Sequence, residues 1–106
     1  MDKDKDTFPE VVCLCGSTKF KDDFERINKE LTLTGRIVIS VAFLGHADNI
    51  PLTKEEKKIL DWVHFRKIQL SDSIHVINKG GYIGDSTSNE INYAKALGLR
   101  ITYMEE

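Results

Sequence analysis

Four short apolar runs, separated by segments with helical periodicity, constrain the fold of this 106-residue chain more than any other feature. The runs are Val11–Cys15, Arg36–Ala42, Ile74–Ile77 and Ile101–Met104. Strands that alternate with helices in this way form parallel sheets with right-handed crossovers. We therefore expect an α/β fold: a small doubly wound parallel sheet of flavodoxin-like kind, with strand order 2-1-3-4 and helices on both faces.

The three intervening segments carry the start and stop signals of helices. The first has an apolar stripe at spacings of four, three and four, and it ends at Gly35. The second begins with the capping-box pattern Thr53–Glu56 and runs to about Leu70. The third spans roughly Thr87–Leu97 and stops at Gly98.

Length and charge limit the classes of partner. We expect a flexible tail over residues 1–8 and a single domain over residues 9–106. The tail has no apolar run, which argues against a secretory signal, and no segment is long enough for a membrane span. The net charge of −2, from 15 basic and 17 acidic residues, attracts neither nucleic acid nor an anionic membrane.

The two cysteines, Cys13 and Cys15, alternate on the first apolar run and so face the same side of a strand. This spacing suits neither a disulfide nor a C-x-x-C site, and we expect two buried small hydrophobic side chains. Free thiols fit a reducing compartment, so a cytoplasmic location is predicted. The histidines also lack the spacing of a metal site, and no metal is predicted.

The expected topology predicts where a ligand binds. In an open parallel sheet this is beyond the carboxyl ends of the strands, at the point where the strand order reverses. Here that point lies between the first and third strands, where the loops Gly16–Lys19 and Asn78–Ser86 meet. Both loops lead into helix N-termini, which favour anions. The predicted substrate-binding residues are Gly16, Ser17, Thr18, Lys19, His46, Tyr82, Ser86 and Thr87.

Glu90 is the candidate catalytic carboxylate, and the residues alone leave two interpretations open. Thr87–Glu90 matches a capping box, in which Glu90 would accept a hydrogen bond from the Thr87 N–H. Glu90 also shares an apolar helical face with Ala94 and Leu97. A carboxylate partly buried on that face is costly unless it has a purpose, which favours a functional role.

Three stretches of the chain resemble the nucleoside 2-deoxyribosyltransferase family and the related nucleoside 5′-monophosphate N-glycosidases. They are Val12–Thr18, His64–Asn78 and Ser86–Ala94. The third is similar to the family motif S-G-T-x-x-E-[IL]-G-Y-A, whose glutamate is the nucleophile. The resemblance implies that Glu90 is the nucleophile here, acting through a glycosyl-enzyme intermediate without a metal or organic cofactor.

The substrate that the resemblance implies is a (deoxy)nucleoside or a nucleoside 5′-monophosphate, in N-glycosyl transfer or hydrolysis. The family has an aspartate eight residues before its Ala-Asp pair; His64 holds that position here and is the candidate proton donor, with Asp85 as the alternative. Ser17, Lys19 and Ser86 would hold a 5′-phosphate. The resemblance also implies a homodimer or higher oligomer. The alternative function is a non-catalytic nucleotide-binding or sensing module on the same fold.

Overall fold

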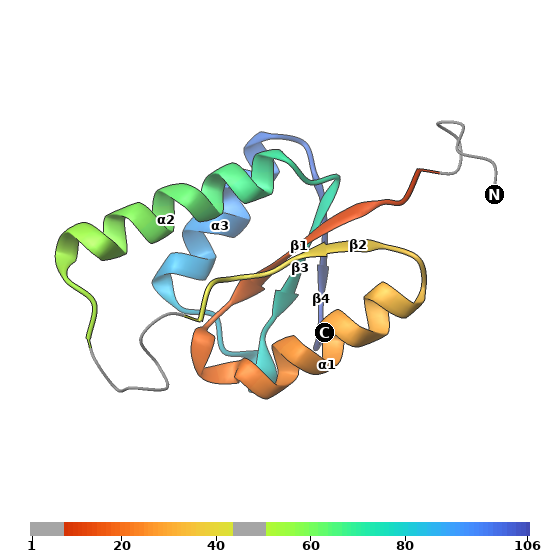
Figure 1. Ribbon diagram of the computed structural model, residues 1–106, viewed down its shortest axis with the longest axis horizontal. Coiled ribbons are helices and arrows are strands. Elements are labelled where there is room, and N and C mark those ends of the chain that lie inside the picture. The colour runs from red at the N-terminus through yellow and green to blue at the C-terminus, as the bar shows by residue number, and fades with distance from the viewer. Residues whose placement is uncertain (1–7, 44–50) are drawn as a thin grey trace.

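Four parallel strands form the central sheet of the computed structural model, which describes residues 8–43 and 51–106 (Figure 1). The strands are β1 (Val11–Gly16), β2 (Ile37–Ile39), β3 (Ser73–Ile77) and β4 (Arg100–Tyr103). Their order in the sheet is β2-β1-β3-β4, and every pairing is parallel. This confirms the strand order and the α/β class that the alternating pattern predicts.

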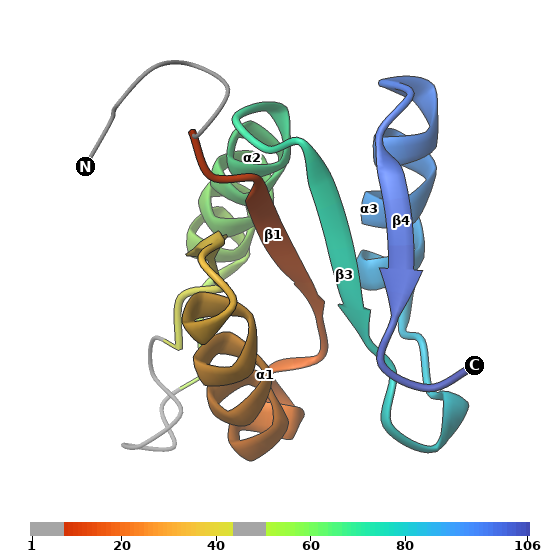
Figure 2. The same cartoon turned by 90° about the vertical axis from the view of Figure 1, so that its right-hand side faces the viewer.

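Helices cover both faces of the sheet, as predicted. They are α1 (Lys21–Leu33), α2 (Lys54–Gln69) and α3 (Asp85–Ala96). Helix α1 packs on one face, whereas α2 and α3 pack together on the other; Figure 2 shows the same layers from the side. Within the described part of the chain, none of the helices combines the length and apolarity needed to cross a membrane.

Strand β1 lies in the middle of the sheet and contributes to both cores. Val12 and Leu14 are buried on the side of α1, while Cys13 and Cys15 are buried on the side of α2 and α3. Successive side chains of a strand point to opposite faces, so a strand covered on both faces is apolar throughout. The prediction that both cysteines are buried and free is confirmed.

The start of α2 follows its sequence signal closely. The Thr53 hydroxyl accepts a hydrogen bond from the Glu56 N–H at 3.0 Å, and the Glu56 carboxylate accepts one from the Thr53 N–H at 2.9 Å. These two bonds are the predicted capping box. They fix the first turn of α2, and therefore the direction in which its cavity-facing side chains point.

Strand β2 is shorter than predicted. Pairing with β1 ends at Ile39, although the apolar run continues to Ala42. At the next residue the Ser40 carbonyl accepts a hydrogen bond from the Lys67 ammonium at 2.8 Å. The chain leaves the sheet here, and a side chain of α2 satisfies the carbonyl. Val41 and Ala42 consequently line a cavity instead of extending the strand.

Helix α3 begins two residues earlier than predicted, and this corrects the expected position of Glu90. Gly84 is the N-cap, and its carbonyl accepts a hydrogen bond from the Ser88 N–H at 2.9 Å. Glu90 is therefore in the second turn of α3. It is too far along the helix to close a capping box with Thr87, so the structural interpretation of that motif is wrong.

Candidate active site at the switch point of the sheet

A cavity of about 440 Å³ opens beyond the carboxyl ends of β1 and β3, where the strand order reverses. One wall comes from the turn that follows β1, and another from the segment between β3 and α3. One face of α2 forms a third wall. The cavity lies where the topology predicts a ligand site, because neighbouring loops diverge there to opposite faces of the sheet.

The structure brings most of the predicted site residues together. The predicted residues that line this cavity are Gly16, Ser17, Thr18, His64, Tyr82, Asp85, Ser86, Thr87 and Glu90. They come from three segments that are far apart in the sequence. The parallel topology alone is enough to bring them to one edge of the sheet.

Two predicted residues have a different outcome. Lys19 does not line the cavity: its ammonium lies 3.7 Å from the centre of the Tyr82 ring, in a cation–π contact. The Ser17 hydroxyl accepts a hydrogen bond from the Lys19 N–H at 3.3 Å and caps a 3₁₀ turn, Thr18–Phe20, which precedes α1. That turn carries the Lys19 side chain toward Tyr82. His46 lies outside the described residues.

Glu90 and His64 form the most buried polar contact of the cavity. Glu90 is 9% exposed and His64 is 6% exposed, and Glu90 Oε1 lies 3.8 Å from His64 Nε2. They project from neighbouring helices, α3 and α2, which pack against each other. Glu90 therefore contacts an imidazole at the cavity wall instead of the backbone of its own helix.

The surroundings of this pair raise the pKa of both groups, but for different reasons. Burial raises the pKa of Glu90 from its ordinary 4.5 to about 7, although the charge of His64 opposes the rise. Burial acts to lower the pKa of His64, but contacts with Cys13 and the charge of Glu90 outweigh it, so that this pKa lies above 6.5. Because the two groups are in contact, their ionisations are coupled.

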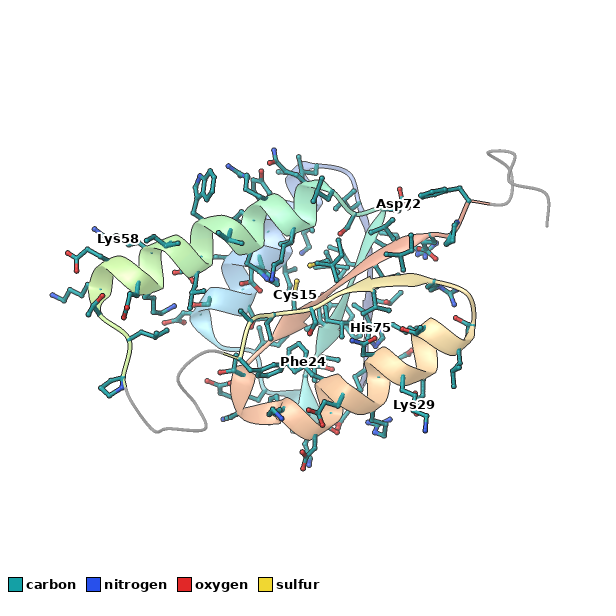
Figure 3. All side chains as sticks on the ribbon, viewed as in Figure 1. Cys15, Phe24, Lys29, Lys58, Asp72 and His75 are labelled. Carbon is teal, nitrogen blue, oxygen red and sulfur yellow. The ribbon has the colours of Figure 1, made fainter. Side chains whose placement is uncertain are left out.

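The two cysteines lie beside the same imidazole. Cys15 Sγ is 3.5 Å and Cys13 Sγ is 3.7 Å from His64 Nε2. Figure 3 shows Cys15 between the sheet and the α2–α3 layer. A hydrogen bond with Cys15 lowers the pKa of the Cys13 thiol to about 6, and the same contact raises the pKa of Cys15. His64 is 51 and 49 residues from them along the chain, so no local spacing in the sequence indicates this cluster.

Three charged residues that line the cavity were not predicted: Lys57, Asp61 and Lys67. Lys57 Nζ lies 3.3 Å from the Ser86 hydroxyl and 3.2 Å from the Asp61 carboxylate, and both Lys57 and Asp61 line the cavity. A sequence signal for Lys57 and Asp61 exists. Lys57, Asp61 and His64 recur at spacings of four and three, so they share one helical face. The face that carries His64 therefore also carries a cation and a second carboxylate.

The Tyr82 side chain closes one side of the cavity. Its ring is about half exposed, lies under the Lys19 ammonium, and meets Phe20 edge to face with the ring centres 6.0 Å apart. Gly80 and Gly81 precede it, with φ of 65° and 82°. Residues with a side chain rarely adopt these positive φ values, which glycine permits. Such an aromatic wall can stack against a flat ligand.

No family model matches the chain, and no curated protein matches it significantly. The fold and the cavity define a parallel α/β protein with a carboxylate–imidazole pair at its switch point. The chemistry of that pair therefore indicates the function of the protein.

Proposed function

We propose that this protein cleaves or transfers the N-glycosidic bond of a (deoxy)nucleoside or nucleoside 5′-monophosphate, with Glu90 as the nucleophile. The observation that carries the proposal is the position of Glu90: its carboxylate is 9% exposed, lines a cavity at the switch point and contacts His64. Burying a carboxylate costs free energy, and such groups concentrate at functional sites. The likeness of Ser86–Ala94 to a glycosyl-transferring motif supports the same role.

In the first step, a Glu90 carboxylate oxygen attacks the anomeric carbon of the sugar while the bond from that carbon to the base nitrogen breaks. The departing base takes a proton from the His64 imidazolium, and a glycosyl ester of Glu90 remains. His64 suits this task because its contact with Cys13 and the charge of Glu90 raise its pKa, which favours the protonated imidazole. Asp85, which also lines the cavity, is the alternative donor.

In the second step, water or a second base attacks the same carbon, and the ester bond to Glu90 breaks. The neutral His64 accepts the proton of the attacking molecule, which restores both groups to their starting states. Attack by water gives hydrolysis, and attack by a base gives transfer. The site needs to exclude bulk water only in the second case.

The rest of the cavity suits the remaining parts of such a substrate. Lys57 and Ser86 lie 3.3 Å apart, and Ser86 is at the N-terminus of α3, so together they can hold a 5′-phosphate. Tyr82 offers a stacking surface for the base. Asp61 offers a hydrogen-bond acceptor for an amino group of that base.

The decisive experiment incubates the protein with a panel of nucleosides and 5′-monophosphates, and measures free base by chromatography. Glu90→Gln is the matched variant, because an amide cannot form the glycosyl ester. We expect base release by the wild type and a loss of at least about a thousandfold in Glu90→Gln, with the fold retained. A protein that binds these compounds but never releases base would instead be a binding or sensing module.

A further inference from the structure

Three potential metal ligands converge on one point beneath the cavity, and a carboxylate lies next to them. The ligating atoms of Cys13, Cys15 and His64 all lie within 4.8 Å of one another, and these three residues are buried. Glu90 Oε1 is 3.8 Å from the same His64 nitrogen. We propose that Cys13, Cys15 and His64 bind a Zn²⁺ ion, with the Glu90 carboxylate in the fourth position.

The distances agree with those of a tetrahedral site. Zinc binds sulfur at about 2.3 Å and imidazole nitrogen at about 2.0–2.1 Å, so tetrahedral angles separate the sulfur and nitrogen ligands by about 3.6 Å. The observed separations from His64 Nε2 are 3.5 Å for Cys15 Sγ and 3.7 Å for Cys13 Sγ. The Glu90 carboxylate lies 3.8 Å from His64 Nε2 but outside the group of atoms that are within 4.8 Å of one another, so it must turn toward the sulfurs to reach the fourth position. The fold therefore already brings the two sulfurs and the imidazole together.

Three groups share the Nε2 atom of His64, although the Cys13 thiol also lies 3.8 Å from the Leu14 carbonyl oxygen. The Nε2 atom of an imidazole has either one hydrogen or one lone pair, so it makes one good hydrogen bond. Here three groups, two thiols and a carboxylate, face that single atom at 3.5–3.8 Å. A metal ion accepts all four ligands at once. It also compensates the negative charge that the thiolates and the carboxylate would otherwise carry inside the protein.

The type of ligand selects the metal. Two thiolates and an imidazole favour Zn²⁺ among the common divalent ions, whereas Mg²⁺ and Ca²⁺ require oxygen ligands. The entry path is the cavity, because His64 and Glu90 line it while the cysteines lie behind them. A bound ion would be reached from solvent through the space that the substrate is proposed to occupy.

The site has a consequence that rests on the proposed function. His64 cannot donate a proton to a leaving base while its Nε2 atom holds a metal ion. Glu90 cannot attack a sugar while its carboxylate is a ligand. Metal binding and glycosyl chemistry therefore exclude each other, and Zn²⁺ should act as an inhibitor that competes with substrate.

The first test uses the reduced wild-type protein and Co²⁺, a spectroscopic substitute for Zn²⁺. We expect one equivalent to bind, with thiolate-to-cobalt charge-transfer absorption and the intense visible bands of a tetrahedral site, and we expect Zn²⁺ to displace it. Stoichiometric binding without the charge-transfer absorption would place the metal elsewhere on the chain and overturn the proposal. So would the absence of binding.

Variants locate the site. Cys15→Ala and His64→Gln should each weaken Zn²⁺ binding, measured by titration calorimetry, by more than the roughly 10–100-fold that loss of a group merely supporting a ligand costs. His75→Gln is the matched control, since His75 is on β3 and hydrogen-bonds Thr102 on β4. Equal affinities in all three variants would overturn the proposal. The wild-type cobalt spectrum decides the question if a variant fails to fold.

Binding and activity are measured separately, so that the two proposals can fail independently. Zinc binding without any base release would remove the proposed function and leave the metal site in place. Base release that is unaffected by saturating Zn²⁺ would remove the metal site at these residues and leave the proposed function in place. Inhibition that a chelator reverses is the expected result.

Discussion

The Glu90 carboxylate lies 3.8 Å from the His64 imidazole, and both side chains are almost completely removed from solvent. The two residues come from different helices, α2 and α3, which strand β3 separates in the sequence. Stability alone does not account for the pair, because a well-packed apolar pair of similar volume is often as stable or more stable. Substitutions in this pair can therefore show separately how it affects stability and how it affects activity.

Replacing Glu90 by glutamine should stabilise the metal-free protein at alkaline pH. The folded state raises the pKa of Glu90 from 4.5 to about 7, so it binds the proton more tightly than the unfolded state does. Between these values the wild type loses stability as the pH rises, by up to roughly 3 kcal/mol. Glutamine does not ionise and escapes this loss.

The measurement is urea unfolding of both proteins with a chelator, near pH 4.5 and at pH 8. The advantage of Glu90→Gln should grow by about 2–3 kcal/mol between the two conditions. An advantage that stays constant with pH would mean that Glu90 ionises freely in the folded state. If Glu90→Gln gains stability in this way and also loses turnover, then the Glu90 carboxylate lowers the stability of the protein but is required for its activity.

The pH dependence of base release should be bell-shaped. Activity should rise through about pH 7 as Glu90 ionises, and it should fall where His64, whose pKa is raised by Cys13 and Glu90, loses its proton. The measurement is kcat/KM from pH 5 to 9 in the presence of a chelator. His64→Gln should lower the rate and abolish the alkaline limb. If that limb persists in His64→Gln, another group, such as Asp85 or a bound water, donates the proton.

Gly16 should tolerate no side chain. A Cβ atom at this position would lie 2.7 Å from the carbonyl oxygen of Ile77, which belongs to the backbone of β3 and cannot move aside. Gly16→Ala should cost about 2–3 kcal/mol of unfolding free energy. Gly35→Ala is the control: its φ is 93°, but nothing lies within 4 Å of the new atom, so only conformational strain of about 1 kcal/mol is expected. Equal losses would mean that β1 and β3 can separate at the switch point.

The sequence predicted the sheet order and most of the cavity because both depend on a repeating pattern. The strand and helix periods determine the topology, and the topology places the turn after Gly16 beside the segment that begins at Tyr82. The start of α3 was misplaced because Gly84 has no side chain with which to signal an N-cap. The association of subunits and the cytoplasmic location stay predictions.

The cluster of Cys13, Cys15 and His64 was beyond the reach of the sequence for a different reason. Its members are joined by packing between β1 and α2 across about 50 residues, and the distances depend on where α2 crosses the sheet. Local spacing carries no information about such a contact. Lys57 and Asp61 were within reach, since they share the helical face of His64, but a charged helical face is usually only solvated.

Two lysines are candidates for holding the phosphate of a substrate. Lys19 was predicted from the sequence, and Lys57 was found in the cavity. Lys57→Ala should weaken binding of a nucleoside 5′-monophosphate by about 1.5 kcal/mol, roughly tenfold in Kd, and leave the matching nucleoside nearly unaffected. The reason is that Lys57 Nζ already lies 3.3 Å from Ser86 at the N-terminus of α3.

Lys19→Ala is the matched control. Its ammonium lies over the Tyr82 ring, so its loss should affect both ligands equally and weakly. Calorimetric titration of Glu90→Gln carrying each lysine change avoids turnover during the measurement. A selective loss of the monophosphate in Lys19→Ala, and not in Lys57→Ala, would return the phosphate to the turn after β1.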